Sequence, residues 1–236
     1  MIETKVRFSE KIDRTETTIS FRFRPKEKFN FLPGQFLQVV FDEEERNNKK
    51  LNKYLSFSCA PDKDYIEVTK RISTSDFSKR LCSLIEGDEV LIKGPMGNCV
   101  LDEGSNKIGF LTGGIGITPI ISMLEYIDIK GLQTDVILFY SNRIEQDIAF
   151  MEELNNWENN NKNIKVIYTV VDCEPKDKKC FFGMIDKDLV ETHMSDYKDR
   201  IFFVFGPPAM VTAMKNICNE VGCIENTVKT ENFVGY

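Results

Sequence analysis

The chain has 236 residues, of which 42% are hydrophobic and 29% charged, a balance typical of a soluble globular protein with two domains of ordinary size. The formal net charge of −6 argues against a nucleic-acid partner. No apolar run reaches the length of a bilayer span, and the start MIETKVRFSEKIDRT is charged where a signal peptide is apolar. We therefore expect a cytoplasmic protein with no membrane partner.

Cysteine and histidine usage makes a metal centre improbable. The seven cysteines include no C-x-x-C pair, and the spacing of Cys218 and Cys223 supplies just one gap of the plant-type iron–sulfur pattern. The single histidine, His193, falls late in a short predicted helix at the surface. We expect no metal and mostly structural, reduced thiols, so that any redox chemistry comes from an organic cofactor.

The first part of the chain alternates apolar and polar residues with a period of two, which predicts strands. The runs are 17–24, 36–41, 65–68 and 89–92, with one helical pattern at 75–85 and a charged, asparagine-rich loop at 42–53. Cations at 22, 24, 26 and 28 are interpreted as a solvated strand face. An antiparallel barrel or sandwich fits this pattern best.

Three motifs in this part could bind a ligand, although each alone also suits ordinary strands and turns. The first is Lys53-Tyr-Leu-Ser-Phe-Ser-Cys-Ala-Pro61, with a cation and hydroxyls on an apolar strand. In the second, Lys70-Arg71 precede Ser75-Asp-Phe-Ser78, so that cations and hydroxyls meet at a helix start, an environment suited to phosphate. The third is the predicted tight turn Gly94-Pro-Met-Gly97-Asn98.

After residue 106 strands and helices alternate, which predicts a parallel sheet with crossover helices on both faces. Strand-like runs are 108–111, 136–140, 164–171 and 201–205, and helical patterns are 119–129, 145–157, 186–192 and 208–221. The polar stretch 102–106 separates the period-two strand pattern from the alternating strand–helix pattern. We therefore predict a domain at 1–102 and another at 106–236.

The segment KIGFLTGGIGITPIISMLE at 107–125 is the most informative in the chain. A buried strand leads into Gly113, Gly114 and Gly116, which permit positive φ and a close ligand approach to main-chain amides. Thr118 can cap the following helix and Pro119 suits its first position. The segment indicates a dinucleotide site, with a plain strand-to-helix turn as the alternative.

Taken in order, these pieces resemble the ferredoxin-NADP reductase superfamily over nearly the whole chain. The most specific are Thr112-Gly-Gly-Ile-Gly-Ile-Thr-Pro119, Phe205-Gly-Pro-Pro-Ala-Met210 and Glu231-Asn-Phe-Val-Gly-Tyr236. The resemblance is to short reductases without an iron–sulfur domain. It implies an N-terminal antiparallel FAD-binding β-barrel, then a parallel-sheet NAD(P)-binding α/β domain whose C-terminal tail covers the flavin.

The resemblance also assigns roles to matching positions. Ser56 would lie near flavin N5, Glu231 near the nicotinamide, and Phe233 over the isoalloxazine, with Tyr236 extending that cover. The remaining flavin-binding positions would be Lys53, Tyr54, Leu55, Lys70, Arg71, Ser75, Phe77, Ser78, Gly94 and Gly97. The nicotinamide nucleotide would contact Thr112, Gly113, Gly114, Gly116, Thr118, Pro119, Tyr140, Ser141, Arg143, Gly206, Pro207 and Met210.

Three positions depart from the family pattern: Lys53 replaces an arginine, Leu55 a tyrosine and Phe205 a cysteine. The implied function is hydride transfer from NAD(P)H to FAD and then electron transfer to a separate carrier such as ferredoxin, flavodoxin or an oxygenase component. The alternatives are a flavin reductase that releases reduced flavin, or an electron-transfer subunit of a larger complex. The sequence does not decide the preference between NADH and NADPH, the identity of the electron acceptor or the oligomeric state.

Overall fold

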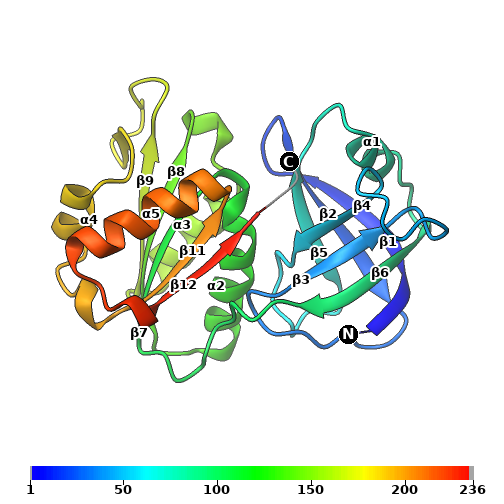
Figure 1. Cartoon of the computed structure of the whole chain (residues 1–236), viewed down its shortest axis with the longest axis horizontal. Coiled ribbons are helices and arrows are strands. Elements are labelled where there is room, and N and C mark those ends of the chain that lie inside the picture. Colours follow the sequence, from blue (N-terminus) through cyan, green and yellow to red (C-terminus); the bar gives the residue numbers. More distant parts are fainter. Residues whose placement is uncertain (1, 234–236) are drawn as a thin grey trace. The chain divides into compact units, whose positions relative to one another are not determined.

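The computed structural model describes residues 2–233 and divides them into two compact units. One unit runs to Leu101 and also includes Thr118–Tyr126; the other contains Asp102–Ile117 and the described chain from Ile127 onward. Each unit has its own sheet (Figure 1).

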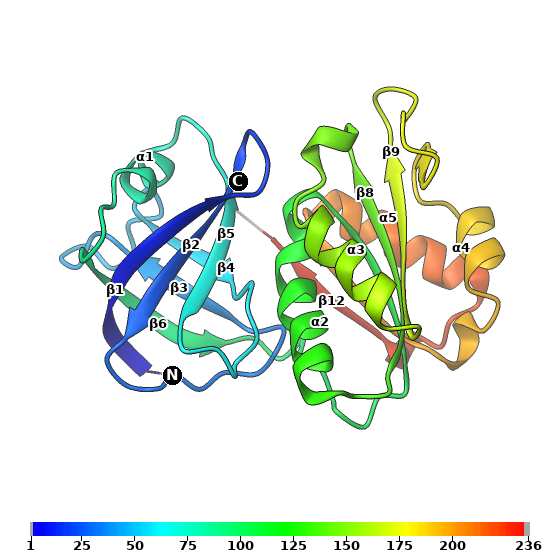
Figure 2. The same cartoon turned by 180° about the vertical axis from the view of Figure 1, so that it is seen from behind.

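The first unit is a nearly closed antiparallel barrel of six strands. The strands lie in the order β4-β3-β6-β1-β2-β5, and the isolated bridge between Phe57 and Val68 brings the two edges together. A single short helix, α1, lies across one end (Figure 2). The bounds are β1 Ile2–Asp13, β2 Thr18–Pro25, β3 Phe36–Val40, β4 Asn52–Ser56, β5 Ile66–Arg71, α1 Asp76–Cys82 and β6 Glu89–Met96. The predicted antiparallel barrel is confirmed.

Inward-facing residues of alternating strands fill the barrel, as the period of two requires. The core contains Val6, Phe8, Phe21, Phe23, Leu37, Val39, Phe57, Ile66, Val68, Val90 and Ile92, closed by Phe77 and Leu81 of α1.

In the predicted basic face at residues 22–28, Arg24, Lys26 and Lys28 are exposed as predicted, whereas Arg22 is half-buried. Arg22 is paired with Glu67 and Glu10, Arg24 with Asp64, and Lys26 with Glu89. These carboxylates come from other parts of the chain, so their effect was invisible in the local pattern.

The loop predicted at 42–53 ends earlier, because Asn52 starts β4 and is buried. Its Oδ1 accepts hydrogen bonds from the amides of Phe41 and Asp42, both at 3.0 Å, and its Nδ2 donates to the Asp42 carbonyl at 3.0 Å. One asparagine side chain therefore replaces several backbone partners that the loop lacks.

The second unit is a six-stranded parallel sheet in the order β10-β9-β8-β7-β11-β12. The strands are β7 Lys107–Gly113, β8 Asp135–Asn142, β9 Ile164–Val170, β10 Cys180–Phe182, β11 Ile201–Gly206 and β12 Val228–Asn232. The helices are α2 Thr118–Lys130, α3 Met151–Asn160, α4 Lys187–His193 and α5 Pro208–Val221. Short 3₁₀ turns are η1 Gly114–Ile117, η2 Glu145–Asp147, η3 Tyr197–Asp199 and η4 Glu225–Thr227.

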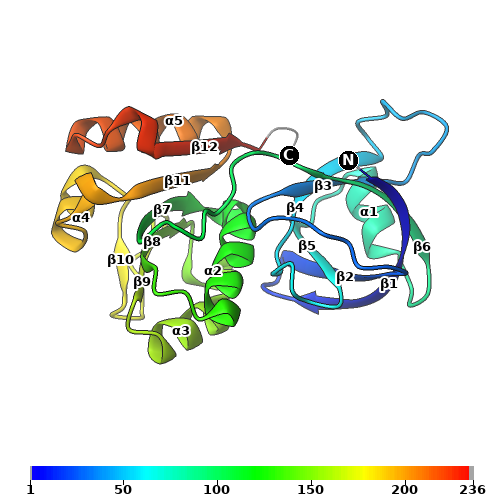
Figure 3. The same ribbon diagram turned by 90° about the horizontal axis from the view of Figure 1, so that it is seen from below.

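Helices α3 and α5 lie on opposite sides of this sheet (Figure 3), as predicted for a parallel sheet with crossovers. The prediction missed β10 and β12, and the single helix predicted at 145–157 is wrong. Instead η2 is followed by Ile148, Ala149 and Phe150, all buried, and α3 begins only after Phe150 takes a φ of 62°. Burial of these three residues outweighs the helical pattern.

Candidate functional site

The two edge strands of the barrel gather cations beside α1. Lys53 lies on β4, and Lys70 and Arg71 end β5. Burial lowers the pKa of Lys70, and the nearby charge of Lys53 lowers it further. The Nε atom of Arg71 is buried without a hydrogen-bond partner among the described residues. A bound anion would satisfy this atom and offset the repulsion between the lysines, so the donor set fits a phosphate group.

Three serine hydroxyls adjoin this cation group where α1 begins. Ser75 is the N-cap of α1, and its side chain accepts a hydrogen bond from the amide of Ser78 at 3.3 Å. The Oγ atoms of Ser73, Ser75 and Ser78 lie 3.0–3.2 Å apart. Ser75 is exposed at this helix start, whereas Ser78 is fully buried, so its predicted direct contact with a ligand does not fit its position. Ser73 is an exposed neighbour that the sequence analysis missed.

Alternate residues of β4 face opposite sides. Leu55 packs against the barrel core, whereas Tyr54 is 61% exposed and makes an edge contact with Phe36 at 5.8 Å. Ser56 ends the strand and is 8% exposed. Lys53 and Leu55 therefore share one face of the strand, as the family pattern requires, and Tyr54 lies on the other.

Some predicted flavin-binding residues have structural roles in the barrel. Phe77 is fully buried and packs against Phe41, so its ring offers no surface to a ligand. Gly94 lies within β6, which continues to Met96, so the tight turn predicted there is wrong. Gly97 has a φ of 97° and lies against the Phe36 ring. These glycines let β3 and β6 approach each other closely.

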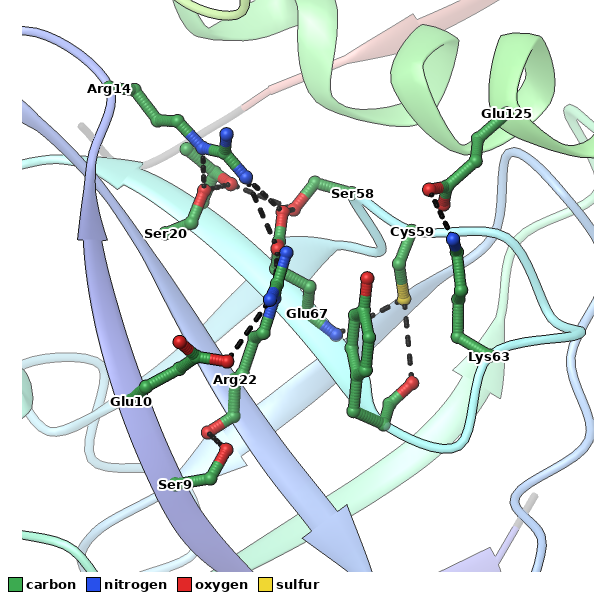
Figure 4. Close-up of polar contacts among 12 residues, drawn as sticks. Ser9, Glu10, Arg14, Ser20, Arg22, Ser58, Cys59, Lys63, Glu67 and Glu125 are labelled. Carbon is green, nitrogen blue, oxygen red and sulfur yellow. Dashed lines mark hydrogen bonds and ion pairs between the residues drawn. The ribbon is translucent and has the colours of Figure 1, made fainter. Parts of the chain in front are cut away.

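A buried carboxylate, Glu67, organises the outer face of β2 and β5 (Figure 4). It pairs with Arg14 at 3.2 Å and with Arg22 at 2.8 Å, and it accepts a hydrogen bond from Ser58 Oγ at 3.0 Å. Ser20, Thr69 and Ser58 continue this network through hydroxyl contacts of 2.6 and 2.7 Å. The network fixes β5 immediately before Lys70.

Two residues of α2 that belong to the first unit hold the segment after β4. Ser122 Oγ donates to the carbonyl of Cys59 at 2.6 Å, and Glu125 accepts a hydrogen bond from the Ala60 amide at 2.7 Å. Glu125 also pairs with Lys63 at 2.9 Å (Figure 4). None of these contacts was predictable locally, because they join residues about 60 positions apart.

In the second unit each glycine of the turn after β7 has a distinct reason to be glycine. Gly114 alone of the three has a positive φ, 52°. A Cβ on Gly113 would lie 2.8 Å from the Ser141 carbonyl and would collide with Met210, and a Cβ on Gly116 would collide with the Phe205 carbonyl. The expectation of positive φ is therefore wrong for Gly113 and Gly116, where close packing is the constraint.

The predicted cap of α2 is also wrong. Ile117 occupies the N-cap position without a side-chain cap, and Thr118 is the first helical residue, followed by Pro119. The reason is that η1 leads directly into α2. Thr112 instead stabilises the turn by donating its Oγ1–H to the Phe205 carbonyl at 2.8 Å, and the fully buried Tyr140 donates its hydroxyl to Gly114 O at 3.1 Å.

The carboxyl ends of β7, β8, β11 and β12 bring the other predicted nucleotide residues to one edge of the sheet. Gly113 is in register with Ser141, and Phe205 with Glu231. Gly206 ends β11, exposed Pro207 follows it, and half-buried Met210 lies against Gly113. Ligands of parallel sheets bind at this edge, so the arrangement supports a nucleotide site.

Arg143 follows β8 and is mostly exposed. Its Nε donates to Asp172 at 2.8 Å, and Asp172 follows the neighbouring strand β9. Asp172 was missed, although two residues that each follow adjacent parallel strands are expected to be neighbours.

Glu231 lies in β12, where burial raises its pKa to about 7. The amide of half-buried Phe233 donates to Gly206 O at 2.8 Å, which attaches this residue to the end of β11. The predicted role of Tyr236 lies outside the described residues.

Residues 2–233 include no group of histidine, cysteine and carboxylate side chains suited to a metal ion. Within the same range, none of the helices is both long and apolar enough to cross a bilayer.

Comparison with known proteins agrees with this arrangement. The oxidoreductase FAD-binding domain family matches residues 3–101, and the oxidoreductase NAD-binding domain family matches residues 110–216. The chain is 26% identical over 90% of its length to NADH-cytochrome b5 reductase 1 of Aspergillus terreus, covering 76% of that protein. It is 27% identical over 94% of its length to flavohemoprotein A of Dictyostelium discoideum, covering 58% of that protein.

A third relative is the glycine betaine monooxygenase reductase subunit of Chromohalobacter salexigens, 28% identical over 87% of this chain and 56% of that one. The chain thus spans under two thirds of the flavohemoprotein and of this reductase subunit.

Two solved structures show the same fold. The FAD/NAD-binding domain of nitric oxide dioxygenase from Vibrio cholerae has a TM-score of 0.85 at 16% identity, with 98% of each chain covered. The ferredoxin NADP+ reductase of Neisseria gonorrhoeae, with bound FAD and NADP, has a TM-score of 0.81 at 18% identity, also covering 98% of each chain.

The two family matches, one over the barrel and one over the parallel sheet, define the class: an oxidoreductase with an FAD-binding and an NAD-binding domain. The chain belongs to the ferredoxin-NADP reductase superfamily and is an FAD-dependent NAD(P)H oxidoreductase.

Proposed function

We propose that this protein takes electrons from NAD(P)H and delivers them to a separate, acidic electron-carrier protein. The observation that carries the flavin part is the half-buried cation group at the edges of β4 and β5, in which the Arg71 Nε atom is buried. A charged pocket in the same unit supports the acidic acceptor.

FAD, when bound, supplies the isoalloxazine ring that takes a hydride from the nicotinamide. Lys53, Lys70 and Arg71 would hold its diphosphate, with the hydroxyl of exposed Ser75 as a further donor, whereas fully buried Ser78 would act through its hydrogen bond to Ser75. Ser56, at the end of β4, donates to the reactive edge of the ring. Leu55 gives the ring an apolar contact but no aromatic stacking, so its hold on the flavin is weaker than that of a tyrosine.

The nicotinamide nucleotide is held at the carboxyl edge of the second unit. Its diphosphate would approach the turn at 113–116, where Gly114 carries no side chain to obstruct it. Gly206, Pro207 and Met210 border the nicotinamide, and Arg143 lies toward the adenosine end. Glu231 holds a proton near neutral pH because burial disfavours its charged form.

The proposed acceptor surface is a pocket of about 360 Å³ on the first unit. Its lining includes the cations Arg46, Lys49 and Lys93, which outnumber the carboxylate of Glu3, and the exposed ring of Tyr54. Tyr54 lies on β4 between Lys53 and Leu55 but faces the other side of the strand, so the pocket shares this strand and not its flavin-facing side. An acidic carrier suits the charge of the pocket.

Charge reversal tests this acceptor. Lys49→Glu is expected to raise KM for an acidic carrier, either ferredoxin or flavodoxin, by about 5–10-fold, with a steeper effect at low salt. The rate with ferricyanide and NADH should stay unchanged, because flavin reduction is untouched. Lys162→Glu, an exposed lysine of the second unit, is the matched control. Equal KM values for the two variants would exclude this docking surface.

A second candidate function is favoured by Lys53 and Leu55, since both weaken the expected grip on flavin. The protein would then bind FAD as a substrate and release it reduced. Dialysis of the purified protein followed by an absorbance spectrum separates the two functions: retained flavin supports the electron-carrier reductase, and colourless protein supports the flavin reductase. Lys53→Arg is expected to tighten FAD binding by about tenfold, measured by fluorescence titration.

A further inference from the structure

The C-terminal end of α5 holds two thiols that the proposed reaction does not use. Cys218 lies in the last turns of the helix and is buried, and Cys223 follows the helix and is half-buried. Both contribute to the same hydrophobic cluster of the second unit. All seven cysteines are free thiols in this structure.

The turn that ends α5 brings these two residues together. Gly222 has a left-handed φ of 82°, the Cys223 amide donates to the Cys218 carbonyl at 2.8 Å, and the Gly222 amide donates to the Asn219 carbonyl at 3.0 Å. This pair of bonds defines a Schellman motif, in which the side chains of the two outer residues contact each other. The outer residues here are Cys218 and Cys223.

The thiols interact as this geometry requires. A side-chain hydrogen bond with Cys223 raises the pKa of Cys218, and burial raises it further. The same hydrogen bond lowers the pKa of Cys223. Since thiolate is the attacking species, the more exposed Cys223 is the nucleophile and the buried Cys218 is placed to react second.

We propose that Cys218 and Cys223 form a reversible disulfide that closes the C-terminal turn of α5. The oxidant is a low-molecular-weight disulfide such as oxidised glutathione. The Cys223 thiolate attacks one of its sulfurs, forming a mixed disulfide and releasing one thiolate. Cys218 sulfur then attacks Cys223 sulfur and releases the second. The two cysteine protons pass to the released thiolates, so two cysteines are oxidised and one small disulfide is reduced.

The turn connects α5 to β12 through η4, so the disulfide would constrain the approach to the strand that carries Glu231. This proposal does not depend on the identity of the electron acceptor or on flavin retention.

The test equilibrates the full chain with defined ratios of reduced and oxidised glutathione, then traps free thiols with iodoacetamide. Both cysteines fall in one tryptic peptide, Asn216–Lys229, because Lys215 and Lys229 flank them. If the internal disulfide has formed, this peptide carries no alkyl group and its mass is two hydrogens lower than that of the reduced, unalkylated peptide. We expect the equilibrium to favour the disulfide about tenfold more in the folded chain than in urea, equivalent to about 30 mV for a two-electron couple.

Single serine variants identify the order of attack. Cys218→Ser should accumulate a glutathione adduct on Cys223, because the second thiol is missing, and Cys223→Ser should resist modification at buried Cys218. Exposed Cys173 controls for general thiol reactivity, and the thermal midpoint of each variant controls for folding. If the wild-type chain stays a dithiol, or accumulates the same adduct as Cys218→Ser, the proposal is wrong. Equal disulfide formation in the folded and urea-unfolded wild type would also overturn it.

Discussion

Glu231 illustrates how one residue acquires its chemistry from burial. A glutamate near the chain end is ordinary in the sequence, but in β12 burial raises its pKa to about 7. The family resemblance predicted its location, whereas the titration shift depends on the side chains that surround it.

This shift predicts a pH-dependent stability. The folded state binds the Glu231 proton more tightly than the unfolded state, so folding stability should fall as the pH rises from the ordinary glutamate pKa toward about 7. Glu231→Gln removes this dependence. The thermal midpoint of the variant should therefore rise relative to that of the wild type as the pH increases from about 5 to about 8. Parallel midpoints for the two proteins across that range would contradict the shift.

The ion pair between Arg143 and Asp172 predicts a change in nucleotide preference. Asp172 accepts a hydrogen bond from the arginine Nε, and if Arg143 lies at the adenosine end as proposed, its negative charge would repel a 2′-phosphate there. Asp172→Asn is therefore expected to raise kcat/KM for NADPH relative to NADH by about 5–10-fold. Asp188→Asn, at an exposed position of α4, is the control. An unchanged ratio would place Arg143 away from the adenosine site.

At the scale of elements, the period-two and alternating strand–helix patterns predicted most strands and helices. Helix α5, with its proline start and Gly222 end, agrees at both bounds. Strands β10 and β12 were missed because each is short or polar and is stabilised by pairing with a neighbour already in the sheet. The break at Phe150 was missed because burial of three consecutive residues decided it.

The glycine turn makes a testable prediction at this scale. Gly116→Ala would place a Cβ 2.5 Å from Thr112 Oγ1 and against the Phe205 carbonyl, and backbone atoms cannot move aside. We expect a loss of about 1–3 kcal/mol in unfolding free energy and weaker nucleotide binding. Urea denaturation measures the first and fluorescence titration the second.

Gly104→Ala is the control, because its Cβ would meet only ordinary contacts, with Asp102 at 3.5 Å. Should Gly116→Ala match Gly104→Ala in both measurements, close packing at the turn would not be the reason for this glycine.

At the scale of the whole molecule, helix α2 is the element that the two units share. It begins after the glycine turn, its first turns belong to the barrel unit, and its last residues belong to the second unit.

The shared helix predicts that the barrel depends on a residue from beyond its own sequence. Glu125→Ala leaves the Ala60 amide without its partner and Lys63 without its ion pair. We expect a loss of about 1–3 kcal/mol in stability and faster hydrogen exchange at Ala60. Asp128→Ala, an exposed position on the same helix, should have neither effect. Unchanged exchange at Ala60 in Glu125→Ala would refute this dependence.

The sequence by itself determined the fold class and the glycine-rich turn, because periodicity and turn residues are local, and its contiguous motifs carry the family resemblance that implied the two cofactors. The tertiary structure decided how the residues of these motifs are packed and paired. It placed Phe77 in the core, made Gly113 and Gly116 packing constraints, and gave Arg143 its partner. It also brought Glu67, Ser122 and Glu125 to their sites. Burial and pairing between distant segments set these outcomes, and no local pattern records them.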